Sequence, residues 1–249
     1  MFDLTAKVAL VTGAGQNVGA GIARALAAQG AHVAVNDYVA ERAEAVVADI
    51  VAEGGVAMAV PFDVTDLDAV VEAVAAVTAE LGPIDICVNN AGNGGVAGMA
   101  PTLFRDMSPG EWGSPIEVNL RGVMNCCHAV IDAMCEQGWG RIITISSGAG
   151  TVGVGIGVAP YSAGKGGGLA FTRSLALEVA RHGVTANTLA IGLMEMQNRD
   201  VTAALARTIP VGRTGRPDDI AAACVWLASE EASWVTAQTI EINGGSHPT

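Results

Sequence analysis

The chain has 249 residues, of which 51% are hydrophobic and 15% charged, and its formal net charge is -12. This composition excludes a disordered chain, and the length fits a single domain over residues 1–249. The negative charge repels nucleic-acid phosphates and anionic lipid, so we expect neither nucleic acid nor a membrane as a partner. Residues 1–13 lack the pattern of a secretion signal, which favours a cytoplasmic protein. The five cysteines include no C-x-x-C pair, which predicts buried reduced thiols and no metal site.

Apolar runs alternate with amphipathic stretches along the whole chain. Strands are predicted at residues 8–11, 32–35, 57–60, 84–88, 141–145, 185–189 and 239–242. Helices are predicted at residues 19–29, 40–53, 67–80, 116–136, 161–181 and 218–228. Repeated strand–helix–strand units predict a parallel sheet with helices on both faces. Two irregular stretches, 93–115 and 192–216, follow carboxyl ends of strands, where ligands bind in such sheets.

A glycine-rich turn, Thr12-Gly13-Ala14-Gly15-Gln16-Asn17-Val18-Gly19, links the first strand to the first helix. Glycine lets the backbone approach a pyrophosphate, and a helix N-terminus supplies free N–H groups and a positive dipole end. The position between a strand and a helix favours a dinucleotide site over an ordinary turn. The predicted cofactor contacts here are Gly13, Gly15, Gln16, Asn17, Val18 and Gly19.

Asp37 ends the second predicted strand, where an acidic side chain accepts hydrogen bonds from the adenosine ribose. A carboxylate there repels a 2′-phosphate, and residues 14–17 contain no Lys or Arg to attract one. Both facts predict NAD rather than NADP as the cofactor.

Tyr161 and Lys165 are one helical turn apart, which places both on the same face of the predicted helix. A phenol with an ordinary pKa of about 10 is too weak a base at neutral pH, and a nearby ammonium lowers that pKa. Tyr161 is therefore predicted to exchange a proton with the substrate oxygen while hydride moves at carbon.

With these motifs the chain resembles the short-chain dehydrogenase/reductase family over essentially its whole length. The resemblance rests on residues 12–19, Asp63-Val64, Asn89-Asn90-Ala91-Gly92, Asn119, Ser146-Ser147, Tyr161 with Lys165, Asn187 and residues 209–213. It implies an α/β fold, a single Rossmann-type doubly wound parallel sheet of seven strands with helices on both faces. It also implies an NAD-dependent alcohol dehydrogenase or ketoreductase.

The resemblance implies a role for each matching position. Tyr161 is the general acid/base, and Lys165 lowers the pKa of Tyr161 and holds the nicotinamide ribose. Ser147 binds the substrate oxygen, and Asn119 holds a water of the proton relay. The further cofactor contacts are Asp63, Val64, Asn90, Ala91, Gly92, Gly192 and Met194, besides Tyr161 and Lys165 themselves.

Four positions depart from the family pattern. Asn17 stands where the turn usually has its second glycine, and Asn tolerates a positive φ better than most residues. Tyr161 follows Ser147 by one residue more than usual, which leaves Ser146 as an alternative hydroxyl. Ile191 replaces a proline, and Met196 replaces the threonine that usually binds the nicotinamide carboxamide.

The walls predicted for the substrate pocket, residues 94–103, 149–158 and 193–197, are mostly apolar. They favour a small, largely apolar secondary alcohol or ketone, with contacts from Ala149, Val154, Val158 and Met196. Family members that reduce carrier-bound acyl chains usually have basic residues where this chain has Gly138-Trp139 and Leu177, which disfavours that role. A hydroxyacyl thioester of coenzyme A, a non-catalytic dinucleotide-binding scaffold and a lyase or epimerase stay open as alternatives.

Four glycines, at positions 164 and 166–168, lie within the predicted helix that carries Tyr161 and Lys165. Each costs about 1 kcal/mol relative to alanine, which close approach of a symmetry-related helix would offset. Since the family commonly assembles through this helix, the chain is predicted to form a homotetramer.

Overall fold

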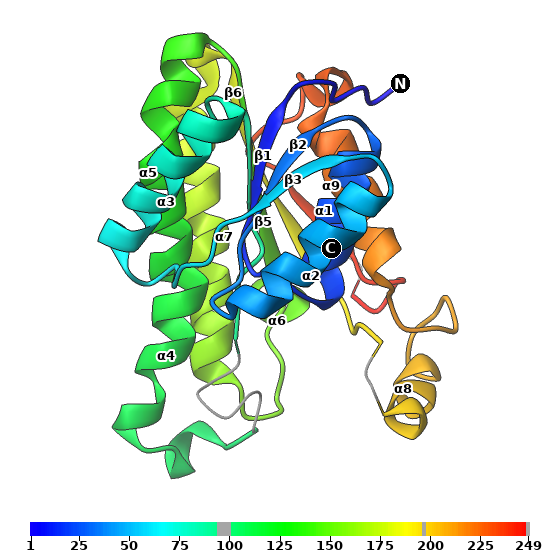
Figure 1. The fold of residues 1–249 in the computed structure, drawn as a ribbon. Coiled ribbons are helices and arrows are strands. Elements are labelled where there is room, and N and C mark those ends of the chain that lie inside the picture. The colour runs from blue at the N-terminus through cyan, green and yellow to red at the C-terminus, as the bar shows by residue number, and fades with distance from the viewer. Residues whose placement is uncertain (94–100, 196–197, 248–249) are drawn as a thin grey trace.

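A computed structural model describes residues 1–93, 101–195 and 198–247. Within these residues, seven strands form a single parallel sheet in the order β3-β2-β1-β4-β5-β6-β7 (Figure 1). The strands are β1 (Val8–Val11), β2 (His32–Val35), β3 (Val56–Ala59), β4 (Ile86–Asn89), β5 (Gly140–Ser147), β6 (Val184–Ile191) and β7 (Thr239–Ile242). The strand order reverses between β1 and β4, where ligands bind in open sheets of this kind. The predicted Rossmann-type fold is confirmed.

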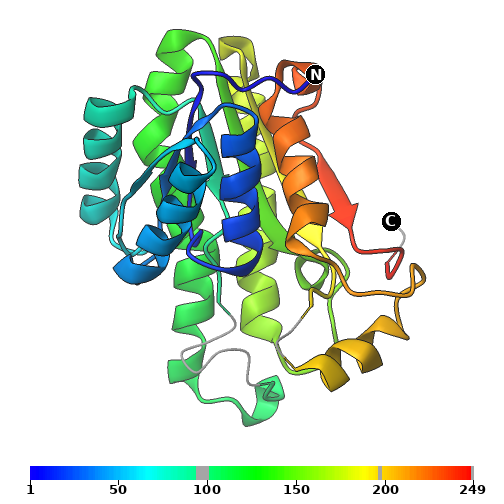
Figure 2. The same ribbon diagram turned by 45° about the vertical axis from the view of Figure 1, so that its right-hand side comes forward.

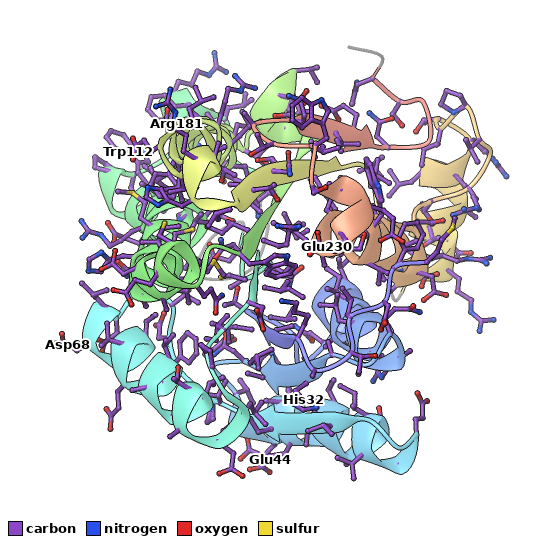
Figure 3. All side chains as sticks on the ribbon, turned by 90° about the horizontal axis from the view of Figure 1, so that it is seen from above. His32, Glu44, Asp68, Trp112, Arg181 and Glu230 are labelled. Carbon is purple, nitrogen blue, oxygen red and sulfur yellow. The ribbon has the colours of Figure 1, made fainter. Side chains whose placement is uncertain are left out.

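Helices cover both faces of the sheet, and each layer encloses its own hydrophobic core (Figure 3). One layer consists of α1 (Asn17–Ala28), α2 (Ala40–Ala52) and α9 (Pro217–Ala228). The other consists of α3 (Leu67–Leu81), α5 (Gly122–Gln137) and α7 (Ala159–Val179). The buried side chains of α1 recur every three or four positions, for instance at Ile22 and Leu26, as expected for an amphipathic helix on a sheet.

Short helical pieces connect these elements at the carboxyl edge of the sheet and beyond α7 and α9. They are η1 (Phe104–Asp106), η2 (Pro109–Glu111), α4 (Gly113–Ile116), the π-helical segment η3 (Glu117–Arg121), α6 (Gly148–Thr151), η4 (Ala180–His182), α8 (Arg199–Ala206) and η5 (Glu230–Ala232). The segment from η1 to α4 and helix α8 both extend past the carboxyl ends of the strands (Figures 1 and 2). They flank the edge where the sequence places the active site.

Two predicted elements differ from the structure. The helix predicted at residues 116–136 is interrupted, because the chain passes from α4 through the π turn η3 before α5 begins at Gly122. The stretch 192–216, predicted to be irregular, contains α8, which is too short for a clear periodic pattern. Asn198 caps α8, since its Oδ1 accepts hydrogen bonds from the backbone N–H groups of Asp200 and Val201.

The glycines of α7 are explained by contacts within the chain itself. A Cβ atom on Gly164 would lie 2.6 Å from the Pro115 carbonyl oxygen, and one on Gly168 would lie 3.0 Å from that of Asn119. A Cβ on Gly166 would lie 3.2 Å from the Gly150 carbonyl oxygen. The argument that these glycines serve a symmetry-related helix is therefore wrong, because segments of the same chain occupy the space beside them.

Among the helices of the described residues, none is long and apolar enough to cross a membrane. Cys87, Cys126, Cys127 and Cys224 are buried free thiols, as predicted, whereas Cys135 is partly exposed.

Candidate active site

A cavity of about 860 Å³ lies along the carboxyl ends of the central strands. Its lining comes from the turn after β1, the ends of β2, β4, β5 and β6, and helix α7. The structure brings together there most of the predicted site residues: Gly13, Gln16, Asn17, Val18, Gly19, Asp37, Asp63, Val64, Asn90, Ala91, Gly92, Tyr161 and Lys165. The glycine-rich turn and the Tyr161/Lys165 pair thus both lie in the wall of one cavity.

The glycine-rich turn has the backbone shape of an anion site. Gly13 has a φ of 60°, and a Cβ there would lie 2.8 Å from the Ala91 Cα. Asn17 has a φ of 47°, so asparagine adopts the left-handed conformation that glycine usually supplies. Gln16 precedes α1 without a capping side-chain hydrogen bond, and the first turn of α1 has no acidic residue. The first N–H groups of α1 are therefore free of a side-chain cap and suited to a pyrophosphate.

Three polar side chains hold this turn against β2 and β4. The Oγ of Thr12 accepts hydrogen bonds from the backbone N–H groups of Asn90 and Ala91, both at 3.1 Å. The Nδ2 of Asn90 donates to the carbonyl oxygens of Thr12 and Gly13, both at 2.9 Å. Asn36, which the sequence analysis missed, accepts from the Gly13 N–H at 3.2 Å. Asn36 immediately precedes Asp37 at the end of β2, and this position in the sequence could have indicated that it belongs to the site.

Asp37 lies in the wall of the cavity with its side chain buried. Its Oδ2 accepts a hydrogen bond from the Gly15 N–H at 3.2 Å, and its Oδ1 accepts one from the Val39 N–H at 3.0 Å. Both bonds fix the carboxylate at the cavity wall, while each oxygen keeps a lone pair for a ribose hydroxyl.

Lys165 and Tyr161 lie on one face of α7, as predicted. The buried Lys165 Nζ donates a 2.8 Å hydrogen bond to the Ile145 carbonyl oxygen and lies 6.0 Å from the centroid of the Tyr161 ring. Burial lowers the pKa of Lys165 to about 8. Burial also raises the pKa of Tyr161, and the hydrogen bond with the Ser147 side chain lowers it in part. The pKa of Tyr161 is thus raised by burial, whereas the sequence analysis expected it to be lowered by Lys165.

The two adjacent serines have different partners in the structure. Ser146 lines the cavity but is buried, and its Oγ donates to the Lys165 carbonyl oxygen at 3.1 Å. Ser147 is half-buried, caps α6 by accepting from the Ala149 N–H at 3.2 Å, and interacts with the Tyr161 side chain. The residues between Ser147 and Tyr161 form α6, a connecting segment and the start of α7.

Asn119 is buried in the π turn η3, and such turns often occur at functional sites. Its Nδ2 donates to the carbonyl oxygens of Asn93 and Pro115, both at 2.7 Å. Its Oδ1 is buried and has no hydrogen-bond partner in the described part of the chain. A Cβ on Gly92 would lie 2.8 Å from both this Oδ1 and the Lys165 Nζ, so the two polar atoms border the same small space. That space is polar and suits a water molecule.

Gly15, Asn119 and Ser147 are not among the residues that line the main cavity, and the other predicted residues lie elsewhere. Gly192 and Met194 line a second cavity of about 140 Å³, beside Ile209 and Ile242. Ala149 and Val158 are buried, Val154 is half-buried, and none of the three lines the main cavity. Met196 lies outside the described residues, as does most of the wall at 94–103. The substrate contacts of the sequence analysis therefore stay predictions.

The cavity wall also includes residues that the sequence analysis did not single out. They are Asn36, Tyr38, Phe62, Thr65, Asn93, Ser114, Glu117, Val118 and Ile145. Most of them neighbour a motif residue in the sequence, which is the signal that could have found them.

The sequence pattern of the short chain dehydrogenase family matches residues 7–204. The chain belongs to this family. It is 40% identical to an acetoacetyl-CoA reductase of Shinella zoogloeoides, over 96% of this chain and 98% of that protein. It is 38% identical to the 3-oxoacyl-[acyl-carrier-protein] reductase FabG of Escherichia coli (strain K12), over 97% of each chain.

Among solved structures, the short-chain dehydrogenase fold of this chain is similar to that of a gluconate 5-dehydrogenase from Burkholderia cenocepacia in complex with NADP and tartrate. The TM-score is 0.90 and the identity 33%, over 98% of this chain and 96% of that chain. Membership and site geometry together make this protein an oxidoreductase that acts on CH–OH groups of a small molecule with a nicotinamide dinucleotide. The glycine turn, the uncapped start of α1 and the buried Asp37 fit such a cofactor.

Proposed function

We propose that this protein interconverts a 3-oxoacyl thioester and the corresponding 3-hydroxyacyl thioester with NAD(H). The observation that carries the proposal is the near full-length similarity to reductases whose names specify acetoacetyl-CoA and 3-oxoacyl substrates. The cavity supports it, because Tyr161 and Lys165 line its wall and Ser147 interacts with Tyr161.

Each polar side chain of the site has its own role at the ketone oxygen. In the direction of reduction, the Tyr161 hydroxyl gives its proton to that oxygen, and the Ser147 hydroxyl donates a hydrogen bond to it. The bound nicotinamide supplies the hydride that reaches the ketone carbon. Lys165, a cation below its pKa of about 8, favours the tyrosinate that forms. We infer that a water between the Asn119 Oδ1 and the Lys165 Nζ returns a proton to Tyr161, because both polar atoms border one small space.

A thioester of coenzyme A fits this chain better than one on an acidic carrier protein. Leu177 is 71% exposed on α7, where family members that act on carrier-bound chains usually have a basic residue. Gly138 occupies the second such position, and the chain as a whole carries a net charge of -12. Like charges would repel an acidic carrier protein.

NAD is the cofactor that Asp37 favours. Its buried carboxylate is fixed by two backbone N–H groups beside the expected place of the adenosine ribose. Hydrogen bonds from the ribose hydroxyls would satisfy its remaining lone pairs, whereas a 2′-phosphate would bring a second negative charge to it.

A free apolar secondary alcohol or ketone is the second candidate substrate. Three large apolar side chains near the carboxyl edge of the sheet, Val152, Ile156 and Leu193, are each about half exposed. Such side chains suit an apolar substrate body without a coenzyme A group.

We also propose a homotetramer, with one interface on the outer surface of α5 and α7. Met124 on α5 is 44% exposed and Leu177 on α7 is 71% exposed. The two helices lie side by side in one layer (Figure 1), and an interface that covers both helices would bury these two exposed apolar side chains.

The proposed reaction is tested by following NADH absorbance with acetoacetyl-CoA, the same acyl group on a carrier protein, and a panel of simple ketones. We expect the highest kcat/KM with acetoacetyl-CoA, and Tyr161→Phe should abolish turnover while NAD binding remains. Faster reduction of simple ketones would favour the second candidate. Full activity of Tyr161→Phe would contradict the proposed role of Tyr161.

A further inference from the structure

Two neighbouring residues near Lys165 each have a buried, unpaired amide oxygen. The Oδ1 atoms of Asn93 and Asn119 are buried, and neither has a hydrogen-bond partner in the part of the chain that the structure describes. The two residues are in direct contact, because the Asn119 Nδ2 donates to the Asn93 carbonyl oxygen at 2.7 Å. A buried acceptor without a donor is costly, so two such oxygens side by side indicate that donors enter this space from solvent.

The water inferred between the Asn119 Oδ1 and the Lys165 Nζ pairs only the first of these oxygens. That water donates to Asn119 and accepts from Lys165, so it keeps one O–H group and one lone pair for a further partner. The Asn93 Oδ1 needs a donor of its own, and none of the described side chains supplies one. Because Asn93 lines the main cavity, a second water can reach this oxygen.

Ser114 orients the amide group of Asn93. The Asn93 Nδ2 donates to the Ser114 Oγ at 3.1 Å, so the Oδ1 is the atom left for a water. The Ser114 hydroxyl accepts this bond and keeps its own hydrogen to donate. Both residues line the main cavity and are half-buried. The polar groups beside Asn119 thus continue through Asn93 to Ser114.

The exposure to solvent increases along this line of side chains. Lys165 and Asn119 are 7% and 1% exposed. Asn93 and Ser114 are half-buried, and the side chain of Glu117 is 46% exposed. Glu117 lines the same cavity as Asn93 and Ser114. A row of polar side chains therefore extends from the buried ammonium to a carboxylate in contact with solvent.

We propose that Asn93 and Ser114 hold a second water, through which protons from solvent reach the water beside Asn119. Each reduction takes one proton from Tyr161, which the first water replaces. The second water passes a proton to the first water and takes one from solvent near the Glu117 carboxylate. One proton thus enters for each ketone reduced, and both waters are restored. Asn93 and Ser114 act through water, so they are positioning residues, and the inference rests on the reaction of the proposed function.

The first test separates the first turnover from the later ones. Burial raises the pKa of Tyr161, so at neutral pH the phenol is protonated beforehand and the first reduction needs no proton from solvent. Stopped-flow absorbance of NADH would follow Asn93→Leu and Ser114→Ala with acetoacetyl-CoA, or with the best ketone of the panel. We expect an unchanged first turnover and later turnovers slower on the order of ten-fold, with a solvent isotope effect in heavy water on the slow phase alone.

Ser108→Ala is the matched control for Ser114→Ala. Ser108 lies in the same segment, is exposed, and its Oγ donates to the Glu111 Oε2 at 2.7 Å, so its loss should change neither phase. Ser114→Thr keeps the hydroxyl and should retain most of the later rate. Imidazole buffer, a small proton donor, should restore the later rate of Ser114→Ala. If Asn93→Leu does not fold, Ser114→Ala decides.

Two kinetic results would overturn the inference. Equal slowing of the first and the later turnovers would mean that the two side chains only shape the site. Unchanged later turnovers in both variants would mean that protons enter elsewhere.

The second test needs no turnover. A crystal structure with NAD bound should show one ordered water between the Asn119 Oδ1 and the Lys165 Nζ, and a second within hydrogen-bond distance of the Asn93 Oδ1. In Asn93→Leu the second water should be missing and the first should remain. An Asn93 Oδ1 without a water in the unmodified protein would overturn the inference, whichever substrate is reduced.

The two proposals can fail separately. If acetoacetyl-CoA is not reduced but both waters are present and the variants slow only the later turnovers of another ketone, the proposed substrate is wrong and the proton path stands. If the thioester is reduced and the variants behave as the unmodified protein, the path is wrong and the reaction stands.

Discussion

The Ser146 hydroxyl donates a 3.1 Å hydrogen bond to the main-chain carbonyl of Lys165, which ties the end of β5 to the catalytic helix. This bond commits Ser146 to the protein itself, while Ser147 interacts with Tyr161. Two adjacent hydroxyls thus have separate tasks.

Alanine substitutions should separate these tasks. Ser147→Ala should lower kcat on the order of a hundred-fold, because it removes the hydroxyl that stabilises the reacting oxygen. Ser146→Ala should lower the free energy of unfolding by about 1 kcal/mol through loss of one hydrogen bond and leave most of kcat. Steady-state kinetics and urea unfolding of both variants check this, and the opposite pattern would assign the catalytic role to Ser146.

Lys165→Met should stabilise the protein without cofactor at neutral pH. The pKa of Lys165 is lowered by burial from 10.5 to about 8, so the unfolded chain binds this proton more tightly than the folded one. The free energy of unfolding therefore rises as the pH increases from about 8 to 10.5. Below pH 8 Lys165 is charged in both the folded and the unfolded chain, so the full cost of burying the cation applies. Replacing the cation removes the penalty but loses the bond to Ile145, for a net gain of roughly 1–2 kcal/mol.

Urea unfolding of Lys165→Met and the unmodified protein at pH 7 and above pH 10.5 measures this effect. The gain should be present at pH 7 and absent at the higher pH, and turnover should fall at both. A variant less stable than the unmodified protein at pH 7 would mean that the ammonium stabilises the fold.

Two glycines on the same helix should respond differently to alanine. A Cβ on Gly164 meets the Pro115 carbonyl oxygen at 2.6 Å, which is backbone and cannot move aside cheaply. A Cβ on Gly167 meets the end of the Leu120 side chain at 3.0 Å, which can change rotamer. Gly164→Ala should destabilise by about 2 kcal/mol or more and disturb Asn119, while Gly167→Ala should be neutral or gain up to about 1 kcal/mol. Thermal unfolding of the two variants compares them directly.

Leu177→Glu should reduce the assembly to a smaller species. A carboxylate on the outer surface of α7 would be buried without a partner in the proposed interface, at a cost large enough to separate subunits. Val51→Glu is the control, because Val51 is 54% exposed on α2. Light scattering at micromolar concentration should show a tetramer for the control, and an unchanged tetramer for Leu177→Glu would place the interface elsewhere.

The strand pattern was readable from the sequence because buried parallel strands are short apolar runs between turns. The ranges predicted for β1, β2 and β7 match the structure, and the others differ by one to a few residues at their ends. The π turn η3 was not predictable, because residues 116–121 continue an apolar helical pattern and the extra residue shows only in the backbone. The contacts that explain the glycines of α7 could not be predicted from the sequence either, since Pro115 and Gly150 lie next to them only in the folded chain.

The candidate site was predictable where one motif supplies both residue type and spacing, as for Tyr161 with Lys165 and for the glycine turn. The site was less predictable where the role of a residue depends on which neighbouring group its side chain contacts. Ser146 and Ser147 are equivalent in the sequence and differ only through their partners.

The close contacts of the α7 glycines also limit how this enzyme can diverge. Gly164 and Gly168 are each matched to a backbone atom of the segment from α4 to η3, and Gly166 is matched to Gly150 in α6. A larger residue at one of these positions requires the facing segment to withdraw, which would displace Asn119 or the loop after Ser147. Substitutions in α7 are therefore coupled to substitutions in two segments that are distant in the sequence. A substitution that is harmful alone becomes acceptable when the facing segment changes with it.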